Sequence, residues 1–114
     1  MISVTLFQKA GELIGCRIVG HSGYAESGKD IVCAGVSVLT STCVNALESV
    51  CGVVANVTDY DEKNGLVSFE LPEEMTEEQR NGSKVLMGAL RQGLEDLTGE
   101  YSQYVKVTMK ERRK

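Results

Sequence analysis

Several residue types that would mark particular classes of protein are scarce in this chain of 114 residues. Proline and histidine each occur once, and tryptophan does not occur. With one histidine, and with no pair of its four cysteines in Cys-x-x-Cys spacing, the sequence predicts no mixed Cys and His metal site. No run approaches the roughly 18 apolar residues of a membrane span, and the first residues lack a signal-peptide pattern. We therefore expect a cytoplasmic protein.

Positive charge is also in short supply. The formal net charge is -4 at pH 7, and the sequence pI is about 5.0. Because phosphate recognition needs a cationic surface, nucleic acid is not expected to be a direct partner. The basic tail at residues 110–114 permits contact with RNA or an acidic partner, and a solvated end is the expected interpretation. The length predicts a single domain over residues 1–114.

The hydrophobic pattern changes period along the chain and predicts seven elements. Alternation of apolar and polar residues predicts strands over 2–8, 13–20, 53–60, 65–71 and 101–110. Apolar residues three and four apart predict helices over 34–51 and 76–98. The order β-β-α-β-β-α-β predicts an α+β domain, with a mainly antiparallel sheet and two helices packed against it.

A glycine-rich loop over about residues 20–30 interrupts this pattern after the second strand. His21, the only histidine, stands at the start of the loop, and Cys33 stands at its end, where the first helix is expected to begin. The two ends of a loop can lie close together, so this spacing permits contact between the imidazole and the thiol. Long ordered loops in small domains are often functional.

The position of Cys33 has a chemical consequence. A thiol attacks as its thiolate, and the unpaired N–H groups at a helix N-terminus favour that negative charge. The N–H groups of Ala34 and Gly35 would also be placed to hold an oxyanion. These features favour a catalytic pair in which Cys33 is the nucleophile and His21 is the base. The alternatives are a small core residue at Cys33 and a surface or hydrogen-bonding residue at His21.

Neighbouring residues permit more than one role. Asp30 either orients His21 or caps the helix, and capping is the safer interpretation. Ser37 either bonds the loop or the substrate backbone, or is simply a polar position on the first helical turn. Tyr24 is either a loop lid or surface packing. The other three cysteines fall on apolar stripes or at a helix end and are expected to be packing residues: Cys16, Cys43 and Cys51.

Two segments, GHSGYA at 20–25 and GKDIVCAGVS at 28–37, closely resemble the ribosomal-processing cysteine proteases called Prp. The resemblance extends over the whole chain. It implies that the family's catalytic histidine and cysteine fall on His21 and Cys33, and that its aspartate falls on Asp30. It also implies a mobile loop over the site at about residues 22–32, which includes Ser22, Gly23, Tyr24 and Gly28.

The resemblance further implies a substrate and a partner. Members of this family remove a short N-terminal extension from large-subunit ribosomal protein number twenty-seven in Firmicutes and related bacteria. Cleavage follows a phenylalanine in a hydrophobic motif. The members are homodimers, and their chemistry uses no cofactor or metal.

Two other functions remain open at the level of sequence. One is a non-enzymatic ribosome-assembly or partner-binding module that uses the same surface. The other is a redox-sensing thiol protein in which Cys33 is oxidised reversibly. Peptide cleavage that depends on Cys33 separates the protease from both.

Overall fold

The computed structural model describes residues 1–26 and 30–112. The elements follow the predicted order. The strands are β1 (Ile2–Lys9), β2 (Glu12–Val19), β3 (Asn56–Asp61), β4 (Leu66–Glu70) and β5 (Val105–Glu111). The helices are α1 (Ile31–Cys51) and α2 (Glu77–Glu100).

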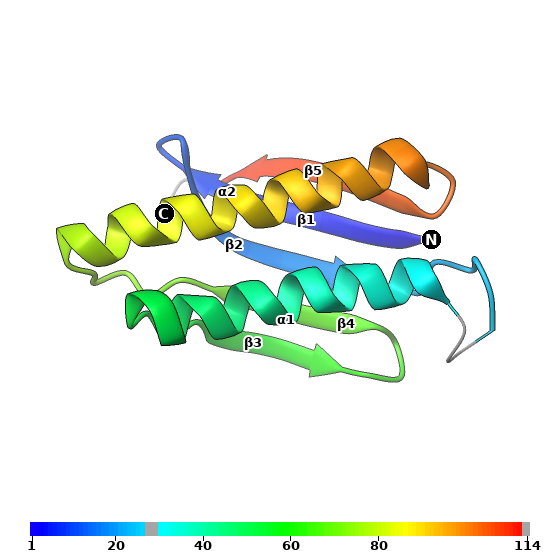
Figure 1. The fold of residues 1–114 in the computed structure, drawn as a ribbon, viewed down its shortest axis with the longest axis horizontal. Helices are drawn as coiled ribbons and strands as arrows, with labels where there is room; N and C mark the ends of the chain where they lie inside the picture. Colours follow the sequence, from blue (N-terminus) through cyan, green and yellow to red (C-terminus); the bar gives the residue numbers. More distant parts are fainter. Residues whose placement is uncertain (27–29, 113–114) are drawn as a thin grey trace.

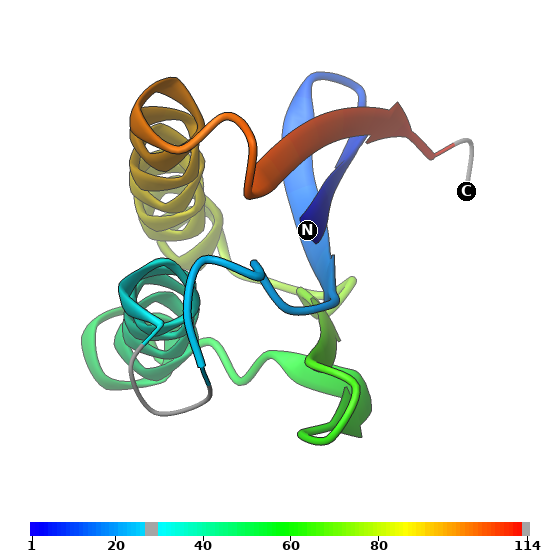
Figure 2. The ribbon, with the colours of Figure 1, turned by 90° about the vertical axis from the view of Figure 1, so that its right-hand side faces the viewer.

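The five strands form one sheet in the order β3-β4-β2-β1-β5. Three neighbouring pairs are antiparallel, and β5 alone runs parallel to its neighbour β1. Both helices lie side by side on the same face of this sheet, so the molecule has two layers (Figures 1 and 2). The predicted α+β class with a mainly antiparallel sheet is confirmed.

The core lies between the helices and the sheet. The alternation in β1 turns Ile2, Val4 and Leu6 inward, and each is at most 2% exposed. The two helices bury matching stripes of residues at helical spacing. They are Val32, Val36, Thr40, Cys43 and Leu47 from α1, and Ser83, Met87, Leu90 and Leu94 from α2.

Helix α1 is apolar enough, and long enough, to meet the composition of a membrane-crossing helix. No stretch of this kind was expected from the sequence, and that expectation is wrong. In the structure its buried stripe packs on the sheet and on α2, as the core helix of a globular domain does. Serine, threonine and asparagine side chains lie on its exposed side: Ser37, Ser41, Thr42, Asn45 and Ser49.

Several element boundaries differ from prediction, and two of them have a clear local reason. Helix α1 begins at Ile31 rather than at residue 34, because the Asp30 side chain caps it there. The last strand begins at Val105 rather than at residue 101. The N–H groups of Tyr104 and Val105 both donate to the Tyr101 carbonyl oxygen, which makes residues 101–104 a turn.

Three segments that are distant in sequence meet at one end of the molecule. They are the end of β2, the start of α1 and the turn between β3 and β4 (Figure 1). The turn between β1 and β2 lies at the opposite end (Figure 1). The end of the molecule where β2 ends and α1 begins holds His21 and Cys33, the two residues that the sequence indicated.

Candidate active site

The start of α1 is built around Asp30. Its Oδ1 accepts hydrogen bonds from the N–H groups of Val32 and Cys33, each at 3.0 Å. Its main-chain carbonyl oxygen accepts the Ala34 N–H, also at 3.0 Å. In this geometry the Ala34 N–H, which was expected to hold an oxyanion, is engaged in the helix.

The loop folds back onto the same carboxylate through Ser22. This side chain is 3% exposed, and its hydroxyl donates to Asp30 Oδ2 while accepting the Tyr24 N–H at 3.0 Å. Burial alone would raise the pKa of Asp30, but the hydrogen bonds from Ser22, Cys33 and Val32 outweigh it and hold that pKa below its usual value. Asp30 is therefore a carboxylate that caps α1 and anchors the loop.

The Cys33 thiol stands in the first turn of α1 and is half-buried. Its Sγ accepts a hydrogen bond from the Ser22 N–H at 3.3 Å. The sulfur therefore receives a main-chain donor at the N-terminal end of a 21-residue helix, where the partial charge of the helix dipole is positive.

His21 is separated from the end of β2 by one residue, Gly20. Gly20 has a φ of +100°, which only glycine adopts without strain, and it turns the chain out of the strand. The His21 side chain is exposed, and its Nε2 lies 2.9 Å from the Lys63 carbonyl oxygen in the β3–β4 turn. The ring is therefore attached to a hairpin that is distant in sequence.

His21 and Cys33 line the same groove, whose volume is about 1020 Å³. Asp30, Ala34 and Ser37 line it from the side of α1. Within the described part of the chain, no hydrogen bond joins His21 to Cys33. The structure thus brings the expected nucleophile and the expected base to one groove but leaves them without direct contact, and catalytic hydrogen bonds often tighten only when substrate binds.

Other residues expected at the site have different surroundings. Gly35 does not line the groove and faces Leu97 of α2 instead. Tyr24 packs edge-to-face against Tyr101 and Tyr104, with ring centroids 5.7 and 5.2 Å apart, and does not line the groove. Of the two roles considered for Tyr24, surface packing is the one observed. Gly23 does line the groove, and Gly28 lies outside the described residues.

One wall of the groove comes from β3 and was not expected from the sequence. Residues 57 and 60 would face opposite sides of a regular strand. The register shifts between Val57 and Asp59, so Val57 pairs with Phe69 while Tyr60 pairs with Val67. This bulge turns Val57 and Tyr60 toward the groove, where they remain 56% and 70% exposed.

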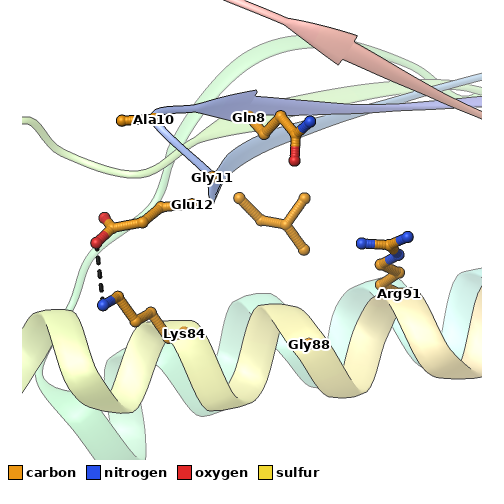
Figure 3. A pocket seen from close by; sticks show the side chains of 8 residues that line it. Gln8, Ala10, Gly11, Glu12, Lys84, Gly88 and Arg91 are labelled. Carbon is orange, nitrogen blue, oxygen red and sulfur yellow. Dashed lines mark ion pairs between the residues drawn. The ribbon is translucent and has the colours of Figure 1, made fainter.

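A second hollow of about 430 Å³ lies at the β1–β2 turn, against α2 (Figure 3). Its charged groups are paired: Glu12 contacts Lys84 at 3.0 Å, and Arg91 contacts Glu95 at 2.8 Å. Among the described residues that line it there is no thiol or imidazole. No three His, Cys, Asp or Glu side chains within residues 1–26 and 30–112 gather at a possible metal site.

Comparison with known proteins gives the family of the chain. Residues 1–106 match the family model described as cysteine protease Prp. The chain belongs to the Prp family. It is accordingly a cysteine protease, a hydrolase that acts on peptide bonds.

Individual proteins of known sequence or structure resemble the chain over most of its length. The ribosomal processing cysteine protease Prp of Bacillus subtilis is 31% identical over 96 residues, which are 84% of this chain and 85% of that protein. The crystal structure of SMU.848 from Streptococcus mutans is 29% identical, with a TM-score of 0.85 over 98% of this chain and 96% of that one. The S. aureus Prp with a covalently linked product peptide has the same fold, with 23% identity and a TM-score of 0.85 over 96% and 100% of the two chains.

Proposed function

We propose that this Prp family member is an endopeptidase that removes the N-terminal extension from the precursor of large-subunit ribosomal protein number twenty-seven. The observation that carries the proposal is the Cys33 Sγ at the start of α1, in the same groove as His21. A Bacillus subtilis relative named as a ribosomal processing protease supports the choice of substrate. The sequence segments that resemble the family support it as well.

The first step forms a covalent bond between enzyme and substrate. His21 accepts the thiol proton of Cys33, and the Ser22 N–H stabilises the resulting thiolate at 3.3 Å. The thiolate then attacks the scissile carbonyl carbon. The carbon–nitrogen bond breaks, His21 returns the proton to the leaving amine, and the extension remains attached to Cys33 as a thioester.

The second step regenerates the enzyme. A water molecule loses a proton to His21 and attacks the thioester carbonyl. The carbon–sulfur bond breaks, the extension leaves as a carboxylic acid, and Cys33 recovers its proton. Every proton and electron pair is supplied by the peptide, a water molecule and these two side chains.

The walls of the groove suit an extended peptide with apolar side chains. The wall from α1 carries small polar groups at Ser37, Ser41 and Asn45, which can bond a peptide backbone. The wall from the sheet carries the exposed Val57 and Tyr60. A cleavage site within a hydrophobic motif fits these surfaces, because apolar side chains would cover the exposed apolar area.

We also propose that the protein is a homodimer and acts in the cytoplasm. The resemblance to the Prp family supports the homodimer. The proposed substrate supports the location, because a bacterial ribosomal precursor is made and assembled in that compartment.

The test is incubation of the precursor protein with enzyme, followed by mass measurement of the products. Wild-type protein is expected to release one N-terminal fragment. Cys33→Ala is expected to lower the cleavage rate about 1,000-fold or more, because it removes the nucleophile. Cys51→Ala, at the other end of α1, is the matched control and is expected to leave the rate unchanged.

His21→Gln separates the roles of the two side chains. It is expected to reduce cleavage strongly while leaving Cys33 present. Cleavage by Cys33→Ala at the wild-type rate would overturn the protease mechanism. Binding of the precursor without cleavage by the wild type would favour the partner-binding module, and a reversible disulfide or sulfenate at Cys33 without cleavage would favour the redox sensor.

A further inference from the structure

The turn between β3 and β4 is attached to the start of the active-site loop at two consecutive residues. His21 Nε2 lies 2.9 Å from the Lys63 carbonyl oxygen. One residue earlier, the Gly20 N–H donates to the Asn64 carbonyl oxygen at 3.2 Å. Two adjacent contacts of this kind hold the imidazole against the turn and limit its rotation.

The chemistry of the Lys63 contact decides which nitrogen of His21 carries the proton. A carbonyl oxygen can only accept a hydrogen bond, so Nε2 must donate and must carry hydrogen. When the ring is neutral, the free electron pair then lies on Nδ1. Nδ1 is therefore the nitrogen that can take a proton.

Asp30, the usual kind of group to orient a catalytic imidazole, is occupied elsewhere. One of its oxygens accepts the Ser22 hydroxyl, and the other accepts the N–H groups of Val32 and Cys33. The only hydrogen bond of the His21 ring within the described residues goes to Lys63. An orienting role for Asp30 is not supported by these contacts.

We propose that the main-chain carbonyl of Lys63 is the orienting group of this site, and that it fixes His21 as the Nε2–H tautomer with Nδ1 as the proton acceptor. The inference rests on the proposed role of His21 as base and specifies how that base is made competent. Residues of the β3–β4 turn that shape the carbonyl's position are then positioning residues, although they touch no reacting atom.

Hydrogen bonds within the β3–β4 turn hold the Lys63 carbonyl in position. The Asn64 N–H and side-chain amide donate to the two oxygens of Asp61, at 3.3 and 2.6 Å. The Gly65 N–H donates to the Glu62 carbonyl oxygen at 3.2 Å. These bonds fix the peptide unit that presents the Lys63 carbonyl.

Gly65 permits the close approach of the turn to the ring. Its φ is +61°, and a Cβ placed on it would overlap the Gly20 carbonyl oxygen and lie 3.3 Å from His21 Cε1. Any larger residue must therefore push the turn and the imidazole apart. Gly11, in the β1–β2 turn at the other end of the sheet, has a φ of +82° with nothing within 4 Å of such a Cβ.

The single histidine makes the tautomer directly measurable. Protein labelled with ¹⁵N-histidine gives one pair of ring nitrogen signals, whose chemical shifts report which nitrogen carries hydrogen. In the wild type, at a pH where the ring is neutral, we expect Nε2–H to predominate. Gly65→Ala is expected to move the signals toward a mixture of tautomers and to lower kcat about 10- to 100-fold, with KM changed much less.

Two further variants control for strain and for folding. Gly11→Ala carries the same backbone strain without the steric overlap and is expected to leave tautomer and kcat unchanged. Asn64→Ala removes the side-chain bond to Asp61 and keeps every main-chain group, and it is expected to shift the tautomer in the same direction as Gly65→Ala. If Gly65→Ala does not fold, Asn64→Ala provides the measurement of the tautomer and of kcat.

The inference is overturned if neutral His21 in the wild type is mainly the Nδ1–H tautomer or an even mixture. It is also overturned if the folded turn variants change neither the tautomer nor kcat. Because the tautomer is read without substrate, this failure differs from failure of the proposed function, which would appear as cleavage that survives Cys33→Ala.

Discussion

The four cysteines differ in what surrounds each sulfur. These differences distinguish the thiol that is expected to react from the thiols that only pack. Cys16 is fully buried between the sheet and the helices, and Cys43 is 5% exposed on the α1 stripe. Burial raises the pKa of the Cys16 thiol to about 12, with a smaller contribution from the nearby Cys43, and burial raises that of Cys43 to about 11. Cys33, by contrast, is half-buried, lines a groove and accepts a main-chain N–H.

We therefore predict selective alkylation of the folded protein by iodoacetamide near neutral pH. Cys33 is expected to react first, while Cys16 and Cys43 stay unmodified until the protein unfolds, because the thiolate is the reactive form. Digestion and mass measurement of the peptides give the order of modification. Labelling of Cys16 or Cys43 in the native state as fast as Cys33 would contradict this assignment.

Asp30 illustrates a residue whose role the sequence left between two alternatives. An aspartate three positions before a cysteine can cap a helix or reach a nearby imidazole, and spacing alone does not choose. The observed contacts to the N–H groups of Val32 and Cys33, and to the Ser22 hydroxyl, show the cap. The site therefore uses this carboxylate to place the sulfur and the loop.

At the scale of elements, the two helices approach each other through glycines of α2. A Cβ on Gly93 would lie 2.6 Å from Cδ2 of Leu39 on α1, and a Cβ on Gly82 would lie 2.5 Å from the Sγ of Cys51. Gly88, between them, has open space around it. The helical period explains the difference, since Gly82 and Gly93 are turned toward α1 and Gly88 is exposed.

Substitution by alanine is expected to have opposite effects at two of these glycines. Gly93→Ala overpacks the helix contact and should lower the free energy of unfolding by about 1–2 kcal/mol. Gly88→Ala adds helix propensity without contact and should raise it by about 0.5–1 kcal/mol. Urea unfolding of both variants beside the wild type measures the difference. Equal changes in both would show that the helix contact tolerates a methyl group at Gly93.

At the scale of the whole molecule, the groove lies between α1 and the β3–β4 hairpin, and three distant segments complete it. The order of strands makes this possible, because β4 pairs with β2 and so places its hairpin beside the segment that follows β2. The position of His21 and the position of the Lys63 carbonyl that it contacts are thus properties of the assembled sheet.

The homodimer proposed from the family resemblance is also tested at this scale. One chain has a mass of 12.4 kDa, so light scattering of the purified protein should give about twice that value. The measurement should be repeated over a dilution series, because the population of a dimer falls with concentration. A mass of one chain at every concentration would rule the dimer out.

The local sequence pattern was sufficient to predict much of the fold and part of the candidate site. The element order followed from the change between twofold and helical periodicity, which depends on neighbouring residues alone. The sequence indicated His21 and Cys33 as a candidate pair because they stand at the two ends of one loop. In contrast, the bulge near Thr58 breaks the strand period, so the sequence alone did not indicate that Val57 and Tyr60 face the same groove.

By itself, the sequence determined the α+β element order, the single imidazole and the thiol near a helix start. These depend on contacts within a few residues, which a periodic pattern records. Only the tertiary structure decided that β5 runs parallel to β1, that Gly35 faces α2 and that a carbonyl 42 residues away meets His21. Such pairings depend on which segments the folded sheet brings together, and no local pattern specifies them.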